Sequence, residues 1–233
     1  RLEAKLRNID LDSKTVELVD GSVVQGRAIV IATGVRRRTL QVAGENEFTG
    51  RGILTSGAKE KHLVKNARVL IVGGGDAALE NALILAEQAS KVIVVHRRNE
   101  FSARKEFVES AAGKPNVEFK PGRSVKGFFG GDHLSEVEIV DEIGKISRIA
   151  VDFALVRIGV QPNIESFRKQ IETTSGGYAV VSAEFETSCA NVFAIGDVAC
   201  PNSPTISTAV GSAAIAVKKL KSSVQSSKSN PKI

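Results

Sequence analysis

Apolar residues along this chain occur with two different periods, which predicts a protein of mixed α and β structure. Unbroken apolar runs within residues 28–31, 68–72 and 91–95 are typical of strands buried on both faces of a sheet. Between the last two runs, residues 76–89 have the spacing of an amphipathic helix. The order strand, glycine loop, helix, strand predicts a βαβ unit, which requires parallel strands and a right-handed crossover.

The pattern changes after this unit. Residues 117–157 alternate between apolar and polar positions and contain Gly- and Pro-rich turn signals, which predicts an antiparallel meander laid over the parallel sheet. Residues 207–220 have the pattern of a final helix. The Ser- and Lys-rich residues 222–233 are predicted to be a disordered tail.

Composition and charge exclude several classes of protein. No apolar run reaches the roughly 18 residues of a membrane-spanning helix, so we expect a cytoplasmic protein without a membrane partner. Five lysines in residues 218–233 supply most of the net charge of +6, and no basic and aromatic surface is interleaved elsewhere, so we expect no nucleic-acid partner. Cys189 and Cys200 are too far apart to form a C-x-x-C, and we expect no metal site. The chain contains no Met, so we expect a fragment of a longer protein.

A glycine-rich segment follows the strand at 68–72 directly. Gly73-Gly74-Gly75-Asp76-Ala77-Ala78 matches the pattern G-x-G-x-x-A and opens a predicted helix, which is the context of a dinucleotide site. In such a site Gly73 allows the tight turn, Gly75 lets a pyrophosphate approach, and Ala78 lets helix and strand pack closely. The helix N-terminus offers N–H groups to the phosphates. The alternative is a packing turn in an α/β protein that binds no nucleotide.

The residues about twenty positions further on indicate which dinucleotide is bound. An NAD site has Asp or Glu there, whereas this chain has His96-Arg97-Arg98. Two guanidinium groups can hold a 2′-phosphate that a carboxylate would repel. The sequence therefore predicts NADPH, and the alternative is that the two arginines merely face solvent.

Eight short segments together resemble the low-molecular-weight thioredoxin reductase family, whose members are flavoproteins that depend on FAD and NADPH. The segments are residues 32–34, 44–45, 50–52, 73–78, 96–98, 159 with 162–163, 193–198 and 208–211. They follow the order of the family and come close to its spacing.

The resemblance implies an α/β protein with two Rossmann-like, three-layer dinucleotide-binding domains. An NADPH domain at residues 43–158 would be inserted in an FAD domain made of residues 1–42 and 159–221. Asp197 would bond the ribityl or phosphate region of FAD, and the helix that begins near Ser207 would point at the flavin ring. The FAD-binding residues implied by the resemblance are Thr33, Gly34, Gly196, Asp197, Thr205, Ile206 and Ser207.

The chain departs from the family at several positions. The family's first strand, with its glycine pattern for FAD, is not found in these residues, so we expect an incomplete FAD domain. Ser56 and Lys59 occupy the positions of the family's C-x-x-C, and neither side chain can exchange a disulfide. We assign no role to Glu60. Ser102 stands where the family has an additional Arg for the 2′-phosphate, and Arg104 would replace that residue only if its side chain turns inward.

These observations favour an FAD-dependent NADPH oxidoreductase. We expect hydride transfer from NADPH to FAD and then transfer to an acceptor without a dithiol, either a redox protein of the ferredoxin or flavodoxin type or a small molecule. We name no catalytic residue, because the cofactors supply the chemistry. One alternative is a thioredoxin reductase homologue with lost or replaced redox cysteines, and another is a regulatory module that binds NADPH without turnover. Whether the chain forms a homodimer stays open.

Overall fold

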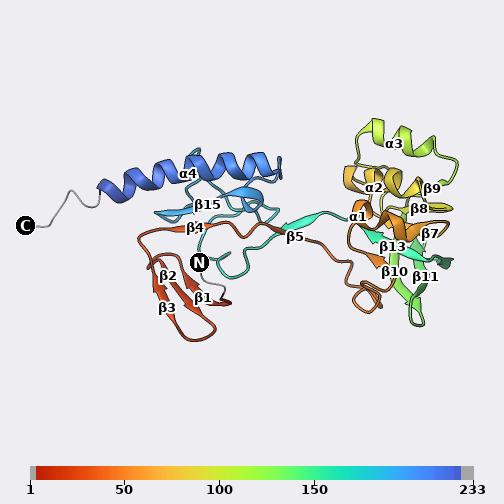
Figure 1. The fold of residues 1–233 in the computed structure, drawn as a ribbon, viewed down its shortest axis with the longest axis horizontal. Helices are drawn as coiled ribbons and strands as arrows, with labels where there is room; N and C mark the ends of the chain where they lie inside the picture. Colours follow the sequence, from red (N-terminus) through yellow and green to blue (C-terminus); the bar gives the residue numbers. More distant parts are fainter. Residues whose placement is uncertain (1–3, 227–233) are drawn as a thin grey trace, which may run out of the picture. The chain divides into compact units, whose positions relative to one another are not determined.

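The computed structural model describes residues 4–226, which form two compact units. Unit 1 contains the residues up to 36 and those from 160 on, and unit 2 contains residues 37–159. The chain passes between the units twice, through a two-stranded ribbon of β5 (Val35–Arg37) and β14 (Val160–Pro162) (Figure 1). The sequence predicts domain boundaries at 42/43 and 158/159, whereas the two units divide at 36/37 and 159/160.

Unit 2 is built on a five-stranded parallel sheet in the order β6-β13-β7-β8-β9. Its strands are β6 (Ile53–Leu54), β13 (Phe153–Val156), β7 (Arg68–Val72), β8 (Lys91–Val95) and β9 (Val117–Lys120). The helices of this unit are α1 (Gly57–Glu60), the 3₁₀ helix η1 (Lys61–Val64), α2 (Asp76–Ala86) and α3 (Lys105–Ala112). The run from β7 through α2 to β8 is the βαβ unit that the sequence predicts.

Apolar residues of β7 point alternately to the two faces of this sheet. Val69 and Ile71 pack with the buried face of α2, whereas Leu70 and Val72 pack with a second, antiparallel sheet. The second sheet consists of β10 (Arg123–Gly130), β11 (Leu134–Asp141) and β12 (Ile146–Ala150). Unit 2 therefore has three layers, and an unbroken apolar run is needed because both faces of the strand are covered.

The meander is shorter than the sequence predicts. Residues 117–120 and 153–156 belong to the parallel sheet as β9 and β13, and only residues 123–150 form the antiparallel layer. The alternating pattern of β9 reflects its position at the edge of the sheet, where its residues are half-buried. An edge strand of a parallel sheet and a strand of a meander thus show the same period.

Unit 1 combines a small antiparallel sheet, a parallel strand pair and a long helix. The antiparallel sheet contains β1 (Leu6–Asp10), β2 (Thr15–Leu18) and β3 (Val23–Gln25), and β4 (Ile29–Ile31) pairs in parallel with β15 (Val192–Ala194). The short 3₁₀ helix η2 (Gly196–Val198) follows β15, and α4 (Ile206–Ser226) comes last. Ile31, Phe167 and Val192 belong to one buried cluster, so this core joins distant parts of the chain.

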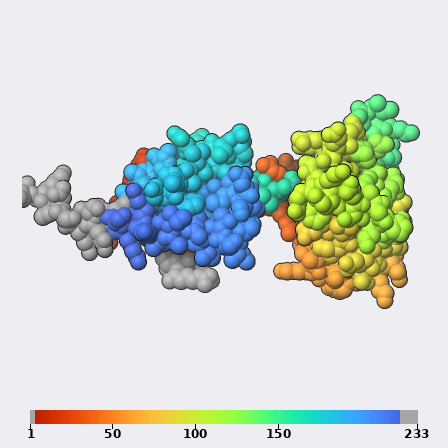
Figure 2. Space-filling model, turned by 90° about the horizontal axis from the view of Figure 1, so that it is seen from above, coloured from red at the N-terminus to blue at the C-terminus, as the bar shows by residue number. Residues whose placement is uncertain are grey.

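The helix α4 extends further than the sequence predicts. Residues 222–226, expected to begin a disordered tail, continue the helix, and residues 227–233 lie outside the described residues. No glycine or proline interrupts the chain between Ser212 and Asn230, so nothing in the backbone chemistry ends the helix at Leu220. Figure 2 shows α4, in blue, at the surface of unit 1. Its Ile206 and Val210 are 86% and 65% exposed.

Within residues 4–226, no helix is both long enough and apolar enough to cross a membrane.

Because Leu155 in β13 is fully buried in the core around α2, the change Leu155→Ala should destabilise unit 2. Removing a buried leucine side chain costs about 2–5 kcal/mol of unfolding free energy. Urea titration followed by circular dichroism measures the change. The control is Leu63→Ala, at a position that is 48% exposed. Equal losses in the two variants would contradict this description of the core.

Candidate functional site

The carboxyl ends of the strands of unit 2 meet at one edge of the parallel sheet. Thr55 follows β6, Arg157 follows β13, Gly73 follows β7, and His96 follows β8. From β7 the chain continues to β8 and β9 on one side of β7 in the sheet, whereas β13 and β6 lie on its other side. The direction in which strands are added to the sheet therefore reverses between β13 and β7. Ligands of open parallel sheets bind at such a reversal, outside the carboxyl ends of the strands.

Each glycine of the loop after β7 has a different neighbour. A Cβ on Gly73, whose φ is +149°, would lie 2.2 Å from the Arg157 carbonyl oxygen and 3.0 Å from the Ala78 Cβ. A Cβ on Gly74 would lie 2.4 Å from the imidazole of His96. Gly75 has more space, since its nearest neighbour would be the Ser102 Oγ at 3.8 Å. The loop is therefore closely packed from beneath at Gly73 and Gly74 and open at Gly75.

Several backbone N–H groups at this loop have no acceptor among residues 4–226. They belong to Gly74, Gly75, Asp76 and Ala77, whereas the N–H groups of Ala78 and Leu79 donate to the Gly75 carbonyl. The positive end of the α2 dipole lies at the same place. Consecutive N–H donors at a helix start form a binding site for phosphate. This part of the structure fits the pyrophosphate of a dinucleotide.

Asp76 and Arg104 form an ion pair beside the glycine loop. The Arg104 backbone N–H donates to Asp76 Oδ1 at 2.7 Å, and Arg104 Nε donates to Oδ2 at 2.9 Å. These interactions, the backbone hydrogen bond above all, lower the pKa of Asp76. The guanidinium of Arg104 also lies over the Phe107 ring, 4.6 Å from its centroid. Arg104 is thus held at the start of α2.

His96 supports the loop from within. Its ring stacks on Phe101 with a centroid distance of 5.5 Å, and its Nε2 is buried without a hydrogen-bond partner among the described residues. Burial lowers the pKa of the imidazole, and the charges of Arg98 and Arg97 lower it further, against a hydrogen bond with the Glu100 backbone. The ring that fills the space beneath Gly74 is therefore neutral at physiological pH.

Arg97 and Arg98 differ from Arg104 in having no acidic partner. Both residues are exposed, and neither side chain forms an ion pair with any residue from 4 to 226. Two solvent-facing guanidinium groups at the end of β8 are available to an anion beside the glycine loop.

Ser102 braces the glycine loop, a role that sequence reasoning missed. Its backbone N–H and its Oγ both donate to the Gly74 carbonyl, at 2.8 and 3.2 Å. A serine there has no sequence pattern of its own, because the contact depends on how the chain returns to the loop after β8.

Residues 55–60, where the sequence predicts the C-x-x-C position, form a capped turn. Ser56 Oγ accepts a hydrogen bond from the Lys59 backbone N–H at the start of α1. Glu60 Oε2 accepts from Thr55 N, Thr55 Oγ1 and Ser56 N at 2.8, 3.0 and 2.6 Å. Burial alone would raise the pKa of Glu60, but these hydrogen bonds and the charge of Arg157 lower it. Glu60 therefore caps the turn as a carboxylate, which is a role that the sequence did not indicate.

The free cysteines lie elsewhere in the chain. Cys189 is buried and Cys200 half-buried, both in unit 1, and burial is the main reason that the pKa of each thiol is raised. A raised pKa disfavours the thiolate that disulfide exchange requires.

The predicted FAD residues gather at the carboxyl ends of β4 and β15 in unit 1. Thr33 Oγ1 donates to the Asn163 carbonyl at 2.6 Å, and the Asn163 N–H donates to the Gly34 carbonyl at 3.0 Å. The Gly196 N–H donates to Ser212 Oγ of α4 at 3.1 Å, and the half-buried Asp197 follows in η2.

The remaining predicted FAD residues lie at the start of α4. Thr205 Oγ1 accepts from the Thr208 N–H at 3.2 Å and lies 3.0 Å from Ser207 Oγ, and Ile206 projects into solvent. The residues of each predicted nucleotide site are thus brought together within one unit.

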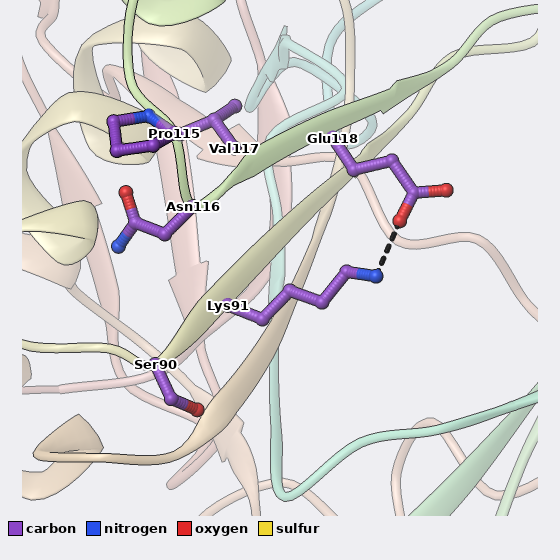
Figure 3. Close-up of a pocket in the computed structure, with 6 residues that line it drawn as sticks. All are labelled: Ser90, Lys91, Pro115, Asn116, Val117 and Glu118. Atoms are coloured by element: carbon purple, nitrogen blue, oxygen red, sulfur yellow. Dashed lines mark ion pairs between the residues drawn. The ribbon is translucent and has the colours of Figure 1, made fainter.

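A hollow of about 430 Å³ lies at the opposite edge of the parallel sheet of unit 2 (Figure 3). The residues that line it lie at the starts of β8 and β9. Two of them, Lys91 and Glu118, form an ion pair with an N–O distance of 2.6 Å. Asn116 donates to the carbonyls of Ala86 and Ala89 and so joins α2 to this edge. The hollow lies away from the glycine loop and is no part of the candidate site. In the described part of the chain, no three His, Cys, Asp or Glu residues are grouped to hold a metal ion.

Comparison with solved structures identifies the fold. The structure of Lactococcus lactis thioredoxin reductase in its FR conformation superposes with a TM-score of 0.81 at 24% identity, covering 94% of this chain and 73% of that one. Thioredoxin reductase from T. acidophilum gives a TM-score of 0.79 at 25% identity, covering 96% and 75%. The α/β fold with Rossmann-type dinucleotide-binding domains is confirmed.

Comparison of sequences identifies the family. Residues 1–218 match the pyridine nucleotide-disulphide oxidoreductase family, and the chain belongs to this family. Thioredoxin reductase of Listeria innocua is 34% identical over 194 residues, which are 82% of this chain and 61% of that protein. Thioredoxin reductase of Mycolicibacterium smegmatis is 32% identical over 220 residues, 91% of this chain and 71% of that protein. The chain thus spans about three fifths of the length of the first of these relatives. The resemblance is confirmed, and FAD and NADPH are the cofactors of the thioredoxin reductases.

The stability of unit 2 should fall in mild acid because His96 is buried as a neutral ring. Its pKa in the folded protein lies below the ordinary value of 6.5, so the unfolded chain binds the proton more readily. The stabilisation is fully present above the unfolded pKa and is lost as the pH falls through 6.5 towards the folded pKa. Urea titrations at about pH 7.5 and about pH 5.5 measure how much unfolding free energy is lost between the two pH values. This loss should be smaller for His96→Gln than for the unchanged protein. The control is His133→Gln, at an exposed turn, and an unchanged loss in His96→Gln would contradict the assignment.

Proposed function

We propose that this chain is the NADPH-oxidising part of a thioredoxin reductase-like flavoprotein whose redox cysteines are replaced. The observation that carries the proposal is the glycine loop of unit 2, where four N–H groups without an acceptor lie beside two arginines without an acidic partner among the described residues. In this arrangement the N–H groups hold the pyrophosphate and Arg97 and Arg98 hold the 2′-phosphate.

Each residue at the loop then has a definite task. Gly75 leaves room for the pyrophosphate, Ser102 bonds the loop carbonyl of Gly74, and His96 packs against Gly74. Arg104 neutralises Asp76, which would otherwise repel a phosphate. A bound FAD would supply the chemistry of hydride acceptance and onward electron transfer, and the residues of the chain would supply positioning and electrostatics.

For the flavin, unit 1 supplies the predicted contacts of Thr33, Gly34, Gly196 and Asp197 and the start of α4. The remaining contacts would come from the part of the protein that corresponds to the unmatched length of its relatives. The exposed Ile206 and Val210 at the start of α4 fit a surface that is covered by such a cofactor or segment.

For the acceptor, we propose a redox protein or a small molecule that needs no dithiol on this chain. The thioredoxin reductase relatives support the label of a homologue with replaced cysteines at least as well as any specific acceptor. The capped turn at Ser56 and Glu60 supports loss of the disulfide route, because no sulfur atom is present there. A regulatory module that binds NADPH without turnover is the competing function.

The change Arg97→Ala together with Arg98→Ala should weaken NADPH binding at least about tenfold, because each charged hydrogen bond contributes about 1.5–3 kcal/mol. NADH binding should stay nearly constant, since NADH has no 2′-phosphate. Calorimetric titration measures both affinities, and Lys126→Ala, an exposed lysine of β10, serves as control. Equal effects on NADPH and NADH would show that the arginines do not select the cofactor.

If the chain functions with FAD, the loaded protein should show the visible absorption band of an oxidised flavin, and NADPH should bleach this band. We expect ferredoxin, flavodoxin or a small oxidant to restore it and thioredoxin to leave it bleached. The variant Ser56→Cys, Lys59→Cys restores a dithiol and tests whether its absence alone blocks thioredoxin. Protein that binds NADPH but no flavin would favour the regulatory module, and restoration of the band by thioredoxin in the unchanged protein would refute a replaced disulfide route.

A further inference from the structure

A second pair of arginines lies at the same edge of unit 2, on the other side of the glycine loop from Arg97 and Arg98. Arg157 follows β13 directly, and β13 separates β7 from β6 in the sheet. The Arg157 backbone is in close contact with Gly73, while its side chain extends to Thr55 at the end of β6. Arg37 reaches the same point from the start of unit 2.

The two guanidinium groups converge on one oxygen atom. Arg157 Nη2 donates to the Thr55 carbonyl at 3.1 Å, and Arg37 Nη1 donates to the same carbonyl. Arg157 Nη1 donates to the Val156 carbonyl at 2.8 Å. Carbonyl oxygens carry no net charge, so they accept hydrogen bonds here without neutralising the two cations.

The carboxylate of Glu60 offsets their positive charge only in part. Glu60 forms no ion pair with Arg37 or Arg157 within the described part of the chain, and its Oε2 is occupied by donors from Thr55 and Ser56. Burial and the neighbouring charge of Arg37 lower the pKa of Arg157 to about 10, against the opposing effect of Glu60. Most of the donors of both guanidinium groups remain available, and an oxyanion would relieve their mutual repulsion.

We propose that Arg37 and Arg157 form a binding site for a phosphate oxyanion, and that this oxyanion is the phosphate on the nicotinamide side of the dinucleotide. In a Rossmann domain the pyrophosphate lies at the glycine loop, and the adenosine half extends towards the second strand of the βαβ unit. Here that second strand is β8, with Arg97 and Arg98 at its end. The nicotinamide half then extends towards β13 and β6, where Arg157 and Arg37 lie.

The inference rests on the proposed NADPH site but on neither flavin binding nor the acceptor. The two arginine pairs would divide the cofactor between them. Arg97 and Arg98 recognise the 2′-phosphate of the adenosine half, and Arg37 and Arg157 position the half that carries the reactive ring.

Two fragments of the cofactor test this division of labour. Nicotinamide mononucleotide carries only the nicotinamide-side phosphate, and 2′,5′-ADP carries only the adenosine-side groups. Calorimetric or NMR titration should show that Arg37→Gln and Arg157→Gln each weaken nicotinamide mononucleotide and NADPH about fivefold or more and leave 2′,5′-ADP unchanged. Arg97→Ala with Arg98→Ala should weaken 2′,5′-ADP and NADPH and leave nicotinamide mononucleotide unchanged. The matched control is Lys65→Gln, which removes an exposed charge just before β7, at the opposite edge of the sheet.

A conservative variant and a competition experiment distinguish the possible outcomes of this test. Arg157→Lys keeps the charge but loses the planar fork, so its affinity should lie between those of the unchanged protein and Arg157→Gln. If Arg157→Gln does not fold, the exposed Arg37→Gln decides alone, with its melting temperature as a check on folding. Inorganic phosphate that competes with nicotinamide mononucleotide supports the site. Phosphate that binds at Arg37 and Arg157 without competing would mean a free anion as the ligand and overturn the assignment.

The failure of this inference can be told from the failure of the proposed function. Fragment affinities that are unchanged in Arg37→Gln and Arg157→Gln, with normal binding of 2′,5′-ADP, would overturn the inference alone. Absence of 2′,5′-ADP and NADPH binding to the unchanged protein would overturn both.

Discussion

Close approach of the backbone at Gly73 is the constraint on which the site in unit 2 depends. A single added carbon atom at Gly73 would lie 2.2 Å from the Arg157 carbonyl oxygen. The absence of a side chain lets β7 turn into α2 while β13 runs alongside, and the helix start therefore lies at the edge of the sheet. The donor groups, the α2 dipole and the flanking arginines all take their positions from that turn.

The residues around the loop show how substitutions at family positions are absorbed. Ser102 binds the loop carbonyl in place of a further cation, and Arg104 pairs with Asp76. In the segment where the sequence predicts the C-x-x-C position, Ser56 and the neighbouring Glu60 satisfy the backbone of a short turn. In each case a local hydrogen bond holds the backbone of the site.

The sequence predicts the βαβ unit and its cofactor class well, because the determinants are local. Strand, glycine loop, helix and basic pair follow one another within thirty-one residues, from Arg68 to Arg98. Prediction from the sequence fails where a strand or a contact depends on residues from distant segments of the chain. The sequence pattern places β9 in the meander because this edge strand alternates like a meander strand, and it places β13 there because its partners β6 and β7 are distant in sequence. The contacts of Ser102 with Gly74 and of Arg157 with Thr55 span 28 and 102 residues, and no spacing pattern indicates them.

The division of the chain has a consequence for its synthesis. Unit 2 is continuous, whereas the core of unit 1 joins Ile31 to Val192 across all of it. Pairing of β5 with β14 and the hydrogen bond from the Arg38 N–H to the Gly159 carbonyl bring the two ends of unit 2 together. When unit 2 folds first, residues 37–159 of the long stretch between Ile31 and Val192 are already closed into one body. The folding of unit 2 then accounts for the chain entropy lost in this closure. The C-terminal part of unit 1 can pair with the N-terminal part as if the two were close in sequence.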